Sequence, residues 1–377
     1  FFDIKSRDWV IGNTALRKEE ETGISAVRNL MYHIRTGSNV YIQGTEYSPK
    51  QLLGIFFGKL LEFIQIRTSI MGIENITIAM DPADENVKLI MEEVFSMIRI
   101  PGSKIRLLGY GECFGYYSVS EESLSGMPGA LLFDFGYDGF FAKKIRTGVR
   151  RGKPVIYVDE FDFSKDFSID SLASTVLREQ MDTKLSNLFM DLNSDSQAGA
   201  VFFTGEGFSE QWFVQTINAV SESCRAFKGS NIYVKGACMA GYMLSQGSSA
   251  DYLIFCKDST RVSISLRAWD NGRPEEILLS PGAADWYDAG FEGDFILDEE
   301  RSIVLNIRSC LSFRETPVEI MLSSFPDRPA KTTRVEVSIK YKNVMECVIS
   351  ITDKGFGDFY RSSGAVVTRY INLEEFI

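Results

Sequence analysis

The spacing of hydrophobic and polar positions divides the chain into regions with different expected structures. From about residue 39 to 120, short apolar runs typical of buried strands alternate with segments whose apolar residues recur every three or four positions, as in helices. The pattern predicts three strands and three helices in alternation: strands at 39–42, 76–80 and 104–108, and helices that begin at Ser48, at Asp84 and near Glu112. This order is typical of a parallel or mixed sheet with helices on its faces.

The same order begins again at Gly129, now preceded by two strands that form a hairpin. The predicted elements are strands at 130–135, 140–145, 154–158, 200–203 and 231–234, and helices at 169–190, after an N-cap at Ser209, and from Gly236. The first region shows no matching hairpin. If the chain contains a duplication, that hairpin is expected before Phe1 or as a poorly represented pair within residues 1–11.

Beyond about residue 252 the pattern changes to strict alternation interrupted by turn residues. Short strands are predicted at 261–266, 295–297, 303–307, 318–322, 335–340, 347–351 and 366–371. Regular short strands of this kind favour a β-sandwich or a barrel. We therefore expect a separate C-terminal β-rich domain that begins near Lys257.

Composition narrows the possible functions. The 377 residues, 45% of them hydrophobic, suffice for two or three domains with their own cores. The formal net charge of -11 disfavours a surface for nucleic acid or anionic membrane. No apolar stretch is long enough to span a bilayer. The densest basic stretch, 143–153, is predicted to be a solvated edge or turn.

The cysteines and the single histidine exclude further classes of protein and of functional site. The six cysteines lack CxxC spacing and several lie in apolar runs, so we expect reduced core thiols in a cytoplasmic protein. The single histidine, His33, leaves no material for a Ser-His-Asp triad or a histidine-rich metal site.

Three local sequences carry candidate chemistry. The run 131–139 (LLFDFGYDG) is a strand that ends in Asp134 and a glycine-containing turn, and 201–208 (VFFTGEGF) is a buried strand that ends in a glycine turn. Both patterns can bring backbone amides against an anion. The third, 234–242 (VKGACMAGY), places small residues on one helix face, a pattern that first indicates close packing.

Together with the repeated element order, these sequences resemble the actin and heat-shock-chaperone ATPase superfamily over roughly residues 9–246. The resemblance implies a duplicated actin-like ATPase fold, with two similar halves around a cleft, followed by a β-sandwich-like C-terminal domain. The corresponding domains are residues 1–128, 129–256 and 257–377. Residues 334–355 are also similar to the last strands of the chaperones' β substrate-binding domain.

The resemblance implies ATP and Mg²⁺ as cofactors and assigns roles to particular residues. Asp134 would organise the metal and take part in catalysis, and Gly136 and Gly139 would contact phosphate. In the adenosine-binding turn the implied contacts are Gly205, Glu206 and Gly207. Glu112, in the segment that connects the halves, would position water or act through magnesium.

The sequence also departs from the family pattern. Tyr137 and Asp138 stand where two consecutive glycines and a threonine are expected, which adds bulk and negative charge near the phosphate. The alternatives remain open for each motif: an ordinary hairpin turn at 136–139, a solvated helix-start glutamate at Glu112, and a packing face in the small-residue helix.

Three functions are consistent with these patterns. The first is a chaperone-like ATP-binding protein that holds a peptide or protein partner through the β domain, where Trp269, Trp286, Tyr287 and Phe291 could line a groove. The second is a degenerate scaffold or binding module that hydrolyses nothing, which the residues at 137 and 138 favour. The third, a small-molecule kinase of the superfamily, is disfavoured by the β-rich C-terminus.

Overall fold

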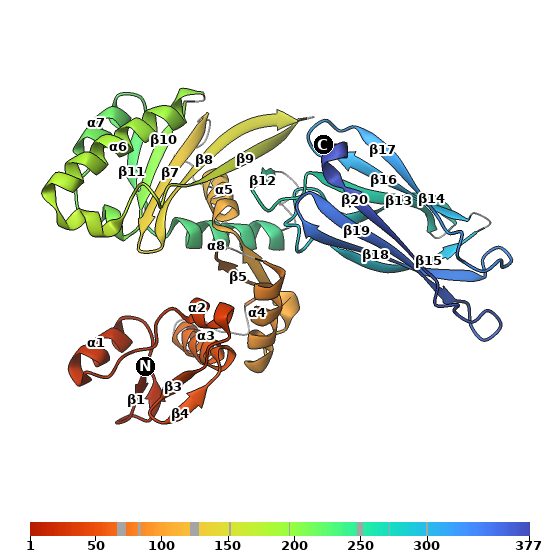
Figure 1. Cartoon of the computed structure of the whole chain (residues 1–377), viewed down its shortest axis with the longest axis horizontal. Helices are drawn as coiled ribbons and strands as arrows, with labels where there is room; N and C mark the ends of the chain where they lie inside the picture. Colours follow the sequence, from red (N-terminus) through yellow and green to blue (C-terminus); the bar gives the residue numbers. More distant parts are fainter. Residues whose placement is uncertain are drawn as a thin grey trace. The chain divides into compact units, whose positions relative to one another are not determined.

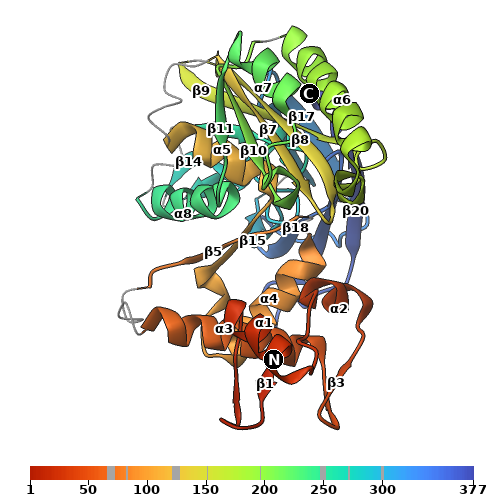
Figure 2. The same ribbon diagram turned by 90° about the vertical axis from the view of Figure 1, so that its left-hand side faces the viewer.

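The computed structural model describes residues 1–65, 73–81, 84–120, 128–150, 152–195, 197–246, 252–270, 272–298 and 301–377. They form two compact units, Phe1–Leu108 and Gly109–Ile377 (Figure 1, Figure 2). Within the described ranges, no helix combines the length and apolar character needed to cross a membrane.

The N-terminal unit consists of helices and small two-stranded sheets. Its helices are α1 (Asn13–Thr22), α2 (Leu30–Thr36), α3 (Pro49–Gln65) and α4 (Glu85–Met97), followed by the short helix η2 (Gly102–Lys104). The pairs of strands are β1 (Phe2–Asp3) with β2 (Asp8–Trp9), β3 (Val40–Ile42) with β4 (Thr45–Tyr47), and β5 (Ile76–Ala79) with β6 (Ile105–Leu108).

The structure confirms individual helices and strands predicted for this unit, but in the described ranges it does not pair all the predicted strands in one sheet. Asp84 caps α4, since its carboxylate accepts a hydrogen bond from the Val87 amide at 2.8 Å. Strands β5 and β6 are parallel, as expected for an α/β unit. In the described residues, however, β3 pairs with β4 and not with this parallel pair. The duplication, in which this unit would contain a second copy of the sheet predicted after residue 129, therefore remains a prediction.

The second unit begins with α5 (Tyr110–Ser120) and contains a six-stranded mixed sheet. Its strands are β7 (Gly129–Gly136), β8 (Gly139–Arg150), β9 (Lys153–Asp162), β10 (Ala200–Thr204), β11 (Arg225–Lys228) and β12 (Leu253–Phe255). Their order in the sheet is β11-β10-β7-β8-β9-β12. Strands β7, β8 and β9 are antiparallel neighbours, while β10 runs parallel to both β7 and β11.

Helices cover both faces of this sheet (Figure 1). On one face, Leu131, Phe133 and Phe135 of β7 pack in one core with α6 (Thr175–Ser194) and α7 (Val214–Ser221). On the other, Phe202 contacts the rings of Phe114 and Tyr117 of α5. Alternation along β7 turns Asp134 toward the α5 side, away from the α6 side. The sequence's near-continuous apolar runs at 130–135 and 200–203 reflect this burial on two faces.

Two predictions for the region between Ser209 and Val234 are wrong. The run Asn231–Val234 is not a strand: α8 (Ile232–Ser245) begins there, and the strand is β11, a few residues earlier. Asn231 has a positive φ of 56°, so the chain turns sharply just before Ile232. Ser209 does not cap α7; its hydroxyl donates to the Glu206 carbonyl and closes the short helix η5 (Glu206–Phe208).

The C-terminal region contains two four-stranded antiparallel sheets. One has the order β14-β13-β16-β17 and the other β15-β18-β19-β20. The strands are β13 (Val262–Asp270), β14 (Arg273–Ser280), β15 (Phe291–Leu297), β16 (Ser302–Ser309), β17 (Glu315–Met321), β18 (Thr333–Asn343), β19 (Glu346–Gly355) and β20 (Val366–Asn372), followed by the short helix η7 (Leu373–Phe376). Buried residues of both sheets form one hydrophobic core, so the predicted β-rich region is present.

A buried ion pair fixes one end of the second sheet. Arg328 donates to both carboxylate oxygens of Asp353 at 2.7 and 2.8 Å, and their side chains are 6% and 0% exposed. Ser363 and Gly355 add further donors to the same carboxylate. Burial alone would raise the pKa of Asp353, yet these hydrogen bonds hold the pKa well below its ordinary value.

Candidate functional site

The two glycine-containing turns lie at the same edge of the six-stranded sheet. Asp134, near the end of β7, pairs in register with Thr204, the last residue of β10. Parallel strands end at one edge, so the turn after β10 lies beside the β7–β8 hairpin. The structure therefore brings together six of the seven predicted site residues: Asp134, Gly136, Gly139, Gly205, Glu206 and Gly207.

Asp134 is held by Tyr233 of α8, whose ring stacks on Tyr110 of α5. The Tyr233 hydroxyl donates to Asp134 Oδ2 at 2.7 Å, and the Tyr233 ring stacks on Tyr110 with centroids 4.1 Å apart and planes 5° apart. Burial raises the pKa of Asp134, and the carboxylates of Glu206 and Asp138 raise it further, against the opposing effects of Tyr233 and Lys143. The carboxyl group of Asp134 is thus mostly buried and already hydrogen-bonded to a tyrosine of this chain.

A buried lysine accompanies this aromatic pair. Lys143 is 3% exposed, and its Nζ lies 5.4 Å from the centre of the Tyr233 ring and 6.0 Å from that of Tyr110. Glu160 Oε2 lies 3.8 Å from Lys143 Nζ and 3.7 Å from that of Lys257. The prediction of a solvated edge is therefore wrong for Lys143, and also for Lys144, which is 6% exposed and donates to the Leu192 carbonyl. Arg151 lies outside the described residues.

Gly205 and Gly207 are required by close packing against the hairpin strand. Gly205 has a φ of 94°, and a Cβ there would lie 2.3 Å from the Phe135 carbonyl oxygen. A Cβ on Gly207 would lie 2.3 Å from the Phe135 ring. The main requirement for both glycines is thus contact between the turn and β7, a role that needs no ligand.

Glu206 lies against the hairpin turn that the resemblance assigns to phosphate. A Cβ on Gly136 would lie 3.0 Å from Glu206 Oε2, so this carboxylate occupies the space beside the turn. Gly139, with a φ of 137°, faces Ser164, whose hydroxyl accepts a hydrogen bond from the Phe140 amide. Tyr137 at the tip is 79% exposed.

Glu112 is placed elsewhere in the second unit. It lies in the first turn of α5, and its charge raises the pKa of Cys256, which burial already raises. It also raises the pKa of Tyr287, again after burial. Its charge thus acts on Cys256 and Tyr287, whereas the Asp134 carboxyl group accepts a hydrogen bond from Tyr233.

The small-residue helix has the packing role that its pattern indicates. A Cβ on Gly236 of α8 would lie 1.8 Å from the carbonyl oxygen of Cys113 in α5. Ala237 and Ala240 are 3% and 0% exposed. This close approach holds α8 against α5, where Tyr233 stacks on Tyr110 and reaches Asp134.

Sequence reasoning missed the cluster of side chains that Asp134 joins through Tyr233 and Lys143. Tyr110, Lys143, Glu160 and Tyr233 come from α5, β8, β9 and α8, and no local spacing relates them. One signal was available: an apolar strand rarely carries adjacent lysines such as Lys143 and Lys144 unless they are paired.

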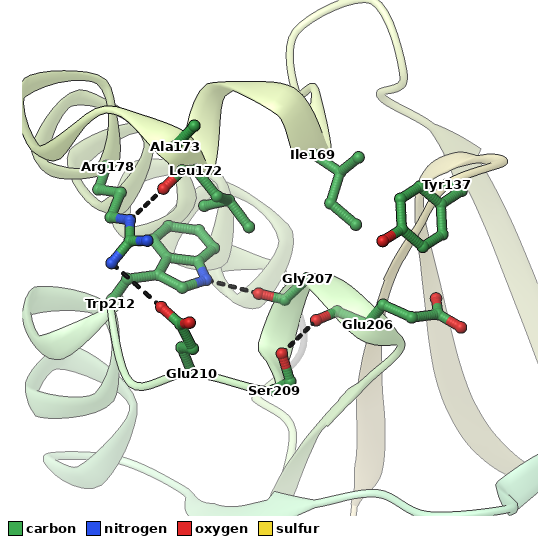
Figure 3. A pocket seen from close by; sticks show the side chains of 10 residues that line it. All are labelled: Tyr137, Ile169, Leu172, Ala173, Arg178, Glu206, Gly207, Ser209, Glu210 and Trp212. Atoms are coloured by element: carbon green, nitrogen blue, oxygen red, sulfur yellow. Dashed lines mark hydrogen bonds and ion pairs between the residues drawn. The ribbon is translucent and has the colours of Figure 1, made fainter. Parts of the chain in front are cut away.

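A pocket of about 470 Å³ lies beside the glycine turn, on the α6 side of the sheet (Figure 3). It is lined by residues of the hairpin tip, the short helix η4 (Ile169–Ala173), α6 and the turn after β10: Tyr137, Ile169, Leu172, Ala173, Arg178, Glu206, Gly207, Ser209, Glu210 and Trp212. Arg178 Nη1 lies 3.1 Å from Glu210 Oε2, and the Trp212 indole donates to the Gly207 carbonyl at 2.6 Å. Asp134 does not line this pocket.

The described residues do not fit a triphosphate with its magnesium ion. Asp138 and Glu206 place negative charge around the hairpin, where phosphate oxygens would need donors. Asp134 is engaged by Tyr233. Among the described residues, no group of three His, Cys, Asp or Glu side chains is arranged to hold a metal ion.

The aromatic residues proposed to line a groove of the β domain are mostly part of its core. Trp286 and Phe291 pack against the shared hydrophobic core. The Tyr287 hydroxyl donates to Asp285 at 2.7 Å. Trp269 alone of the four is strongly exposed, at 73%. These four side chains therefore do not form one continuous exposed surface.

Two solved structures that match this chain are only weakly similar to it. A ROK family protein from Streptococcus pneumoniae TIGR4, solved in complex with sucrose, has a TM-score of 0.34 and 13% identity over 50% of this chain and 87% of that chain. The ROK hexokinase from Thermus thermophilus has a TM-score of 0.29 and 11% identity over 43% of this chain and 71% of that chain. At these TM-scores neither likeness assigns a property to this chain, and the specific likeness to heat-shock chaperones gains no support.

Comparison with protein families is more informative. No curated protein matches the sequence. Residues 259–373 match a domain of unknown function, DUF8552, and residues 2–257 match the C-terminal region of a family of unknown function, DUF5716. Because the second match spans more than half of the chain, the protein belongs to the DUF5716 family.

Proposed function

We propose that this protein is a relative of the actin-like ATPases that uses the fold as a binding module and hydrolyses no nucleotide. The element order of residues 129–245 supports the relationship: an antiparallel β7-β8-β9 hairpin sheet is followed by α6, β10, α7, β11 and α8. This is the order on which the sequence resemblance rests. The two sheets after residue 257 act as a β-sandwich-like domain attached to this module.

One observation carries the proposal. The position that the superfamily uses for phosphate and magnesium carries two further carboxylates here, Asp138 in the hairpin turn and Glu206 against Gly136. A nucleotide triphosphate would add several negative charges to this place, and removing its water without paired donors would cost free energy. Binding of a peptide or protein partner needs no such charge balance.

Nucleotide binding without hydrolysis is the second candidate. The pairing of Thr204 with Asp134 in the β10–β7 register favours nucleotide binding. This register sets the turn after β10 beside the β7–β8 hairpin, as a nucleotide site of this superfamily would require. Under this alternative Glu206 turns away from Gly136, and ATP with Mg²⁺ enters between the two turns. A chaperone cycle or a small-molecule kinase activity would further require turnover.

Two measurements on the full chain separate these functions. We expect the thermal unfolding midpoint to stay the same at millimolar ATP and Mg²⁺, and we expect no phosphate release above the buffer rate. A shift in the midpoint that persists in Asp134→Asn would support the binding-only candidate. Turnover that disappears in Asp134→Asn would refute the proposal and establish an enzyme.

A further inference from the structure

The pocket beside the glycine turn has two ends with similar chemistry (Figure 3). At one end, Arg178 is paired with Glu210 at 3.1 Å, in the same pocket as the Trp212 ring. At the other end lie Glu206 and the ring of Tyr137. Each end thus offers a carboxylate and an aromatic ring, but only the first contains an arginine of this chain.

The second end is open to a ligand. Tyr137 is 79% exposed at the hairpin tip, and Glu206 is exposed. In the described part of the chain the Glu206 carboxylate lies in no ion pair, whereas Glu210 is paired with Arg178. Ile169 and Leu172 supply an apolar wall between the two ends.

The charges near the Tyr137–Glu206 end of the pocket favour a cationic ligand. The Glu206 carboxylate lies beside Gly136, and Asp138 is exposed in the same hairpin turn as Tyr137, so two carboxylates lie at or next to this end of the pocket. Arg178, the arginine that lines the same pocket, is already paired with Glu210 at 3.1 Å. A cationic group beside Glu206 would therefore meet a negative potential, in contrast to the phosphate that the fold resemblance implies.

We propose that the Tyr137–Glu206 end of this pocket binds the guanidinium group of an arginine side chain from a partner protein. A guanidinium is planar and can stack on an exposed aromatic ring while it donates two parallel hydrogen bonds to a carboxylate. Lysine offers a point charge and lacks this planar geometry. The proposal rests on the proposed binding function and gives it a partner class: a protein segment that presents an exposed arginine.

The test uses the full chain and a short probe peptide. The probe is acetyl-Gly-Gly-Arg-Gly-Gly-amide, and its two controls replace arginine with citrulline, which removes the charge, or with lysine, which keeps it. Binding is measured from the change in the peptide's NMR signals on titration with protein. We expect the arginine peptide to bind roughly tenfold more tightly than the citrulline peptide, as for a hydrogen bond to a charged group, and more tightly than the lysine peptide.

Variants assign the binding to this pocket. Glu206→Gln should weaken the arginine peptide roughly tenfold, and Tyr137→Ala should weaken it about two- to fivefold, as expected for a stacked cation at an exposed site. Glu319→Gln, the same change at an exposed position of β17, is the matched control and should leave the affinity unchanged. Circular dichroism verifies that each variant is folded.

Three outcomes overturn the inference: equal affinity for the citrulline peptide, equal affinity for the lysine peptide, or unchanged affinity in a folded Glu206→Gln protein. These outcomes are independent of the nucleotide measurements. If Mg-ATP binds and arginine selectivity is still observed, the proposed function fails and the arginine site stands. If neither ligand binds, the arginine site fails, and the absence of hydrolysis stands.

Discussion

Replacing Asp353 with asparagine should strongly destabilise the C-terminal sheets. The native carboxylate accepts two hydrogen bonds from Arg328, at 2.7 and 2.8 Å, and others from Ser363 and Gly355. Asparagine keeps one oxygen acceptor but turns an NH₂ group toward these donors. It also leaves the Arg328 side chain, 6% exposed, as a buried charge without a counterion.

The magnitude follows from the burial of both partners. Breaking a buried ion pair by neutralising one member costs about 3–5 kcal/mol, because the remaining charge stays desolvated. At about 1.4 kcal/mol per factor of ten, local opening should become roughly a hundred to several thousand times more frequent. Hydrogen-exchange mass spectrometry of the full chain measures this in peptides from β18, β19 and residues 356–364.

Asp298→Asn is the matched control, since Asp298 is exposed. Similar exchange rates in the two variants would refute the reasoning. A pH test is independent: the pKa of Asp353 lies below the ordinary value of 3.8, so the unfolded chain binds more protons between the two values. The stabilisation should therefore be complete above about pH 4–5 and should decline as the pH falls further, and Asp353→Asn should lack this decline in denaturant unfolding.

Three further changes test other parts of the structure. Gly236→Ala should weaken the contact of α8 with α5 by about 1–3 kcal/mol. Its control is Gly58→Ala, also within a helix but with no atom near the added Cβ, which should stabilise α3 by up to about 1 kcal/mol. Hydrogen exchange in each helix measures whether that helix is stabilised or destabilised. Tyr233→Phe should raise the pKa of Asp134 further and lower the free energy of unfolding by about 1–3 kcal/mol. Because the folded pKa of Asp134 already exceeds 3.8, the contribution of Asp134 to stability should increase as the pH falls toward 3.8, and denaturant unfolding should show a larger increase in the variant. Phe359→Ser should change the unfolding free energy by less than about 0.5 kcal/mol, since this side chain is 96% exposed; a loss above about 1 kcal/mol would contradict the exposed position.

The elements that the sequence predicted correctly are those with strong local signals. The strand at 200–203 is a continuous apolar run between turn residues, and the helix after Asp84 has both a cap and helical spacing. The boundary at 231 failed because Ile232, Tyr233 and Val234 have high strand propensity. Their helical conformation depends on the turn at Asn231 and on the packing of α8 against α5, which local patterns do not encode.

The two turns of the candidate site could be predicted from the sequence, but the side chains that contact Asp134 could not. The hairpin at 136–139 and the turn at 205–207 are set by glycines at fixed positions, and the registry of β7 with β10 brings them together. The hydrogen bond from Tyr233 to Asp134 joins residues 99 positions apart in sequence. Such long-range contacts decide whether this carboxyl group is available to a metal, and no spacing in the sequence reveals them.

Isothermal titration of the full chain with ATP in excess Mg²⁺ tests the central claim, that the carboxylates around the hairpin exclude a nucleotide triphosphate. Because Glu206 lies beside Gly136 and Asp134 is engaged by Tyr233, we predict no saturable heat up to millimolar ATP. A saturable signal of one ATP per chain would contradict the account.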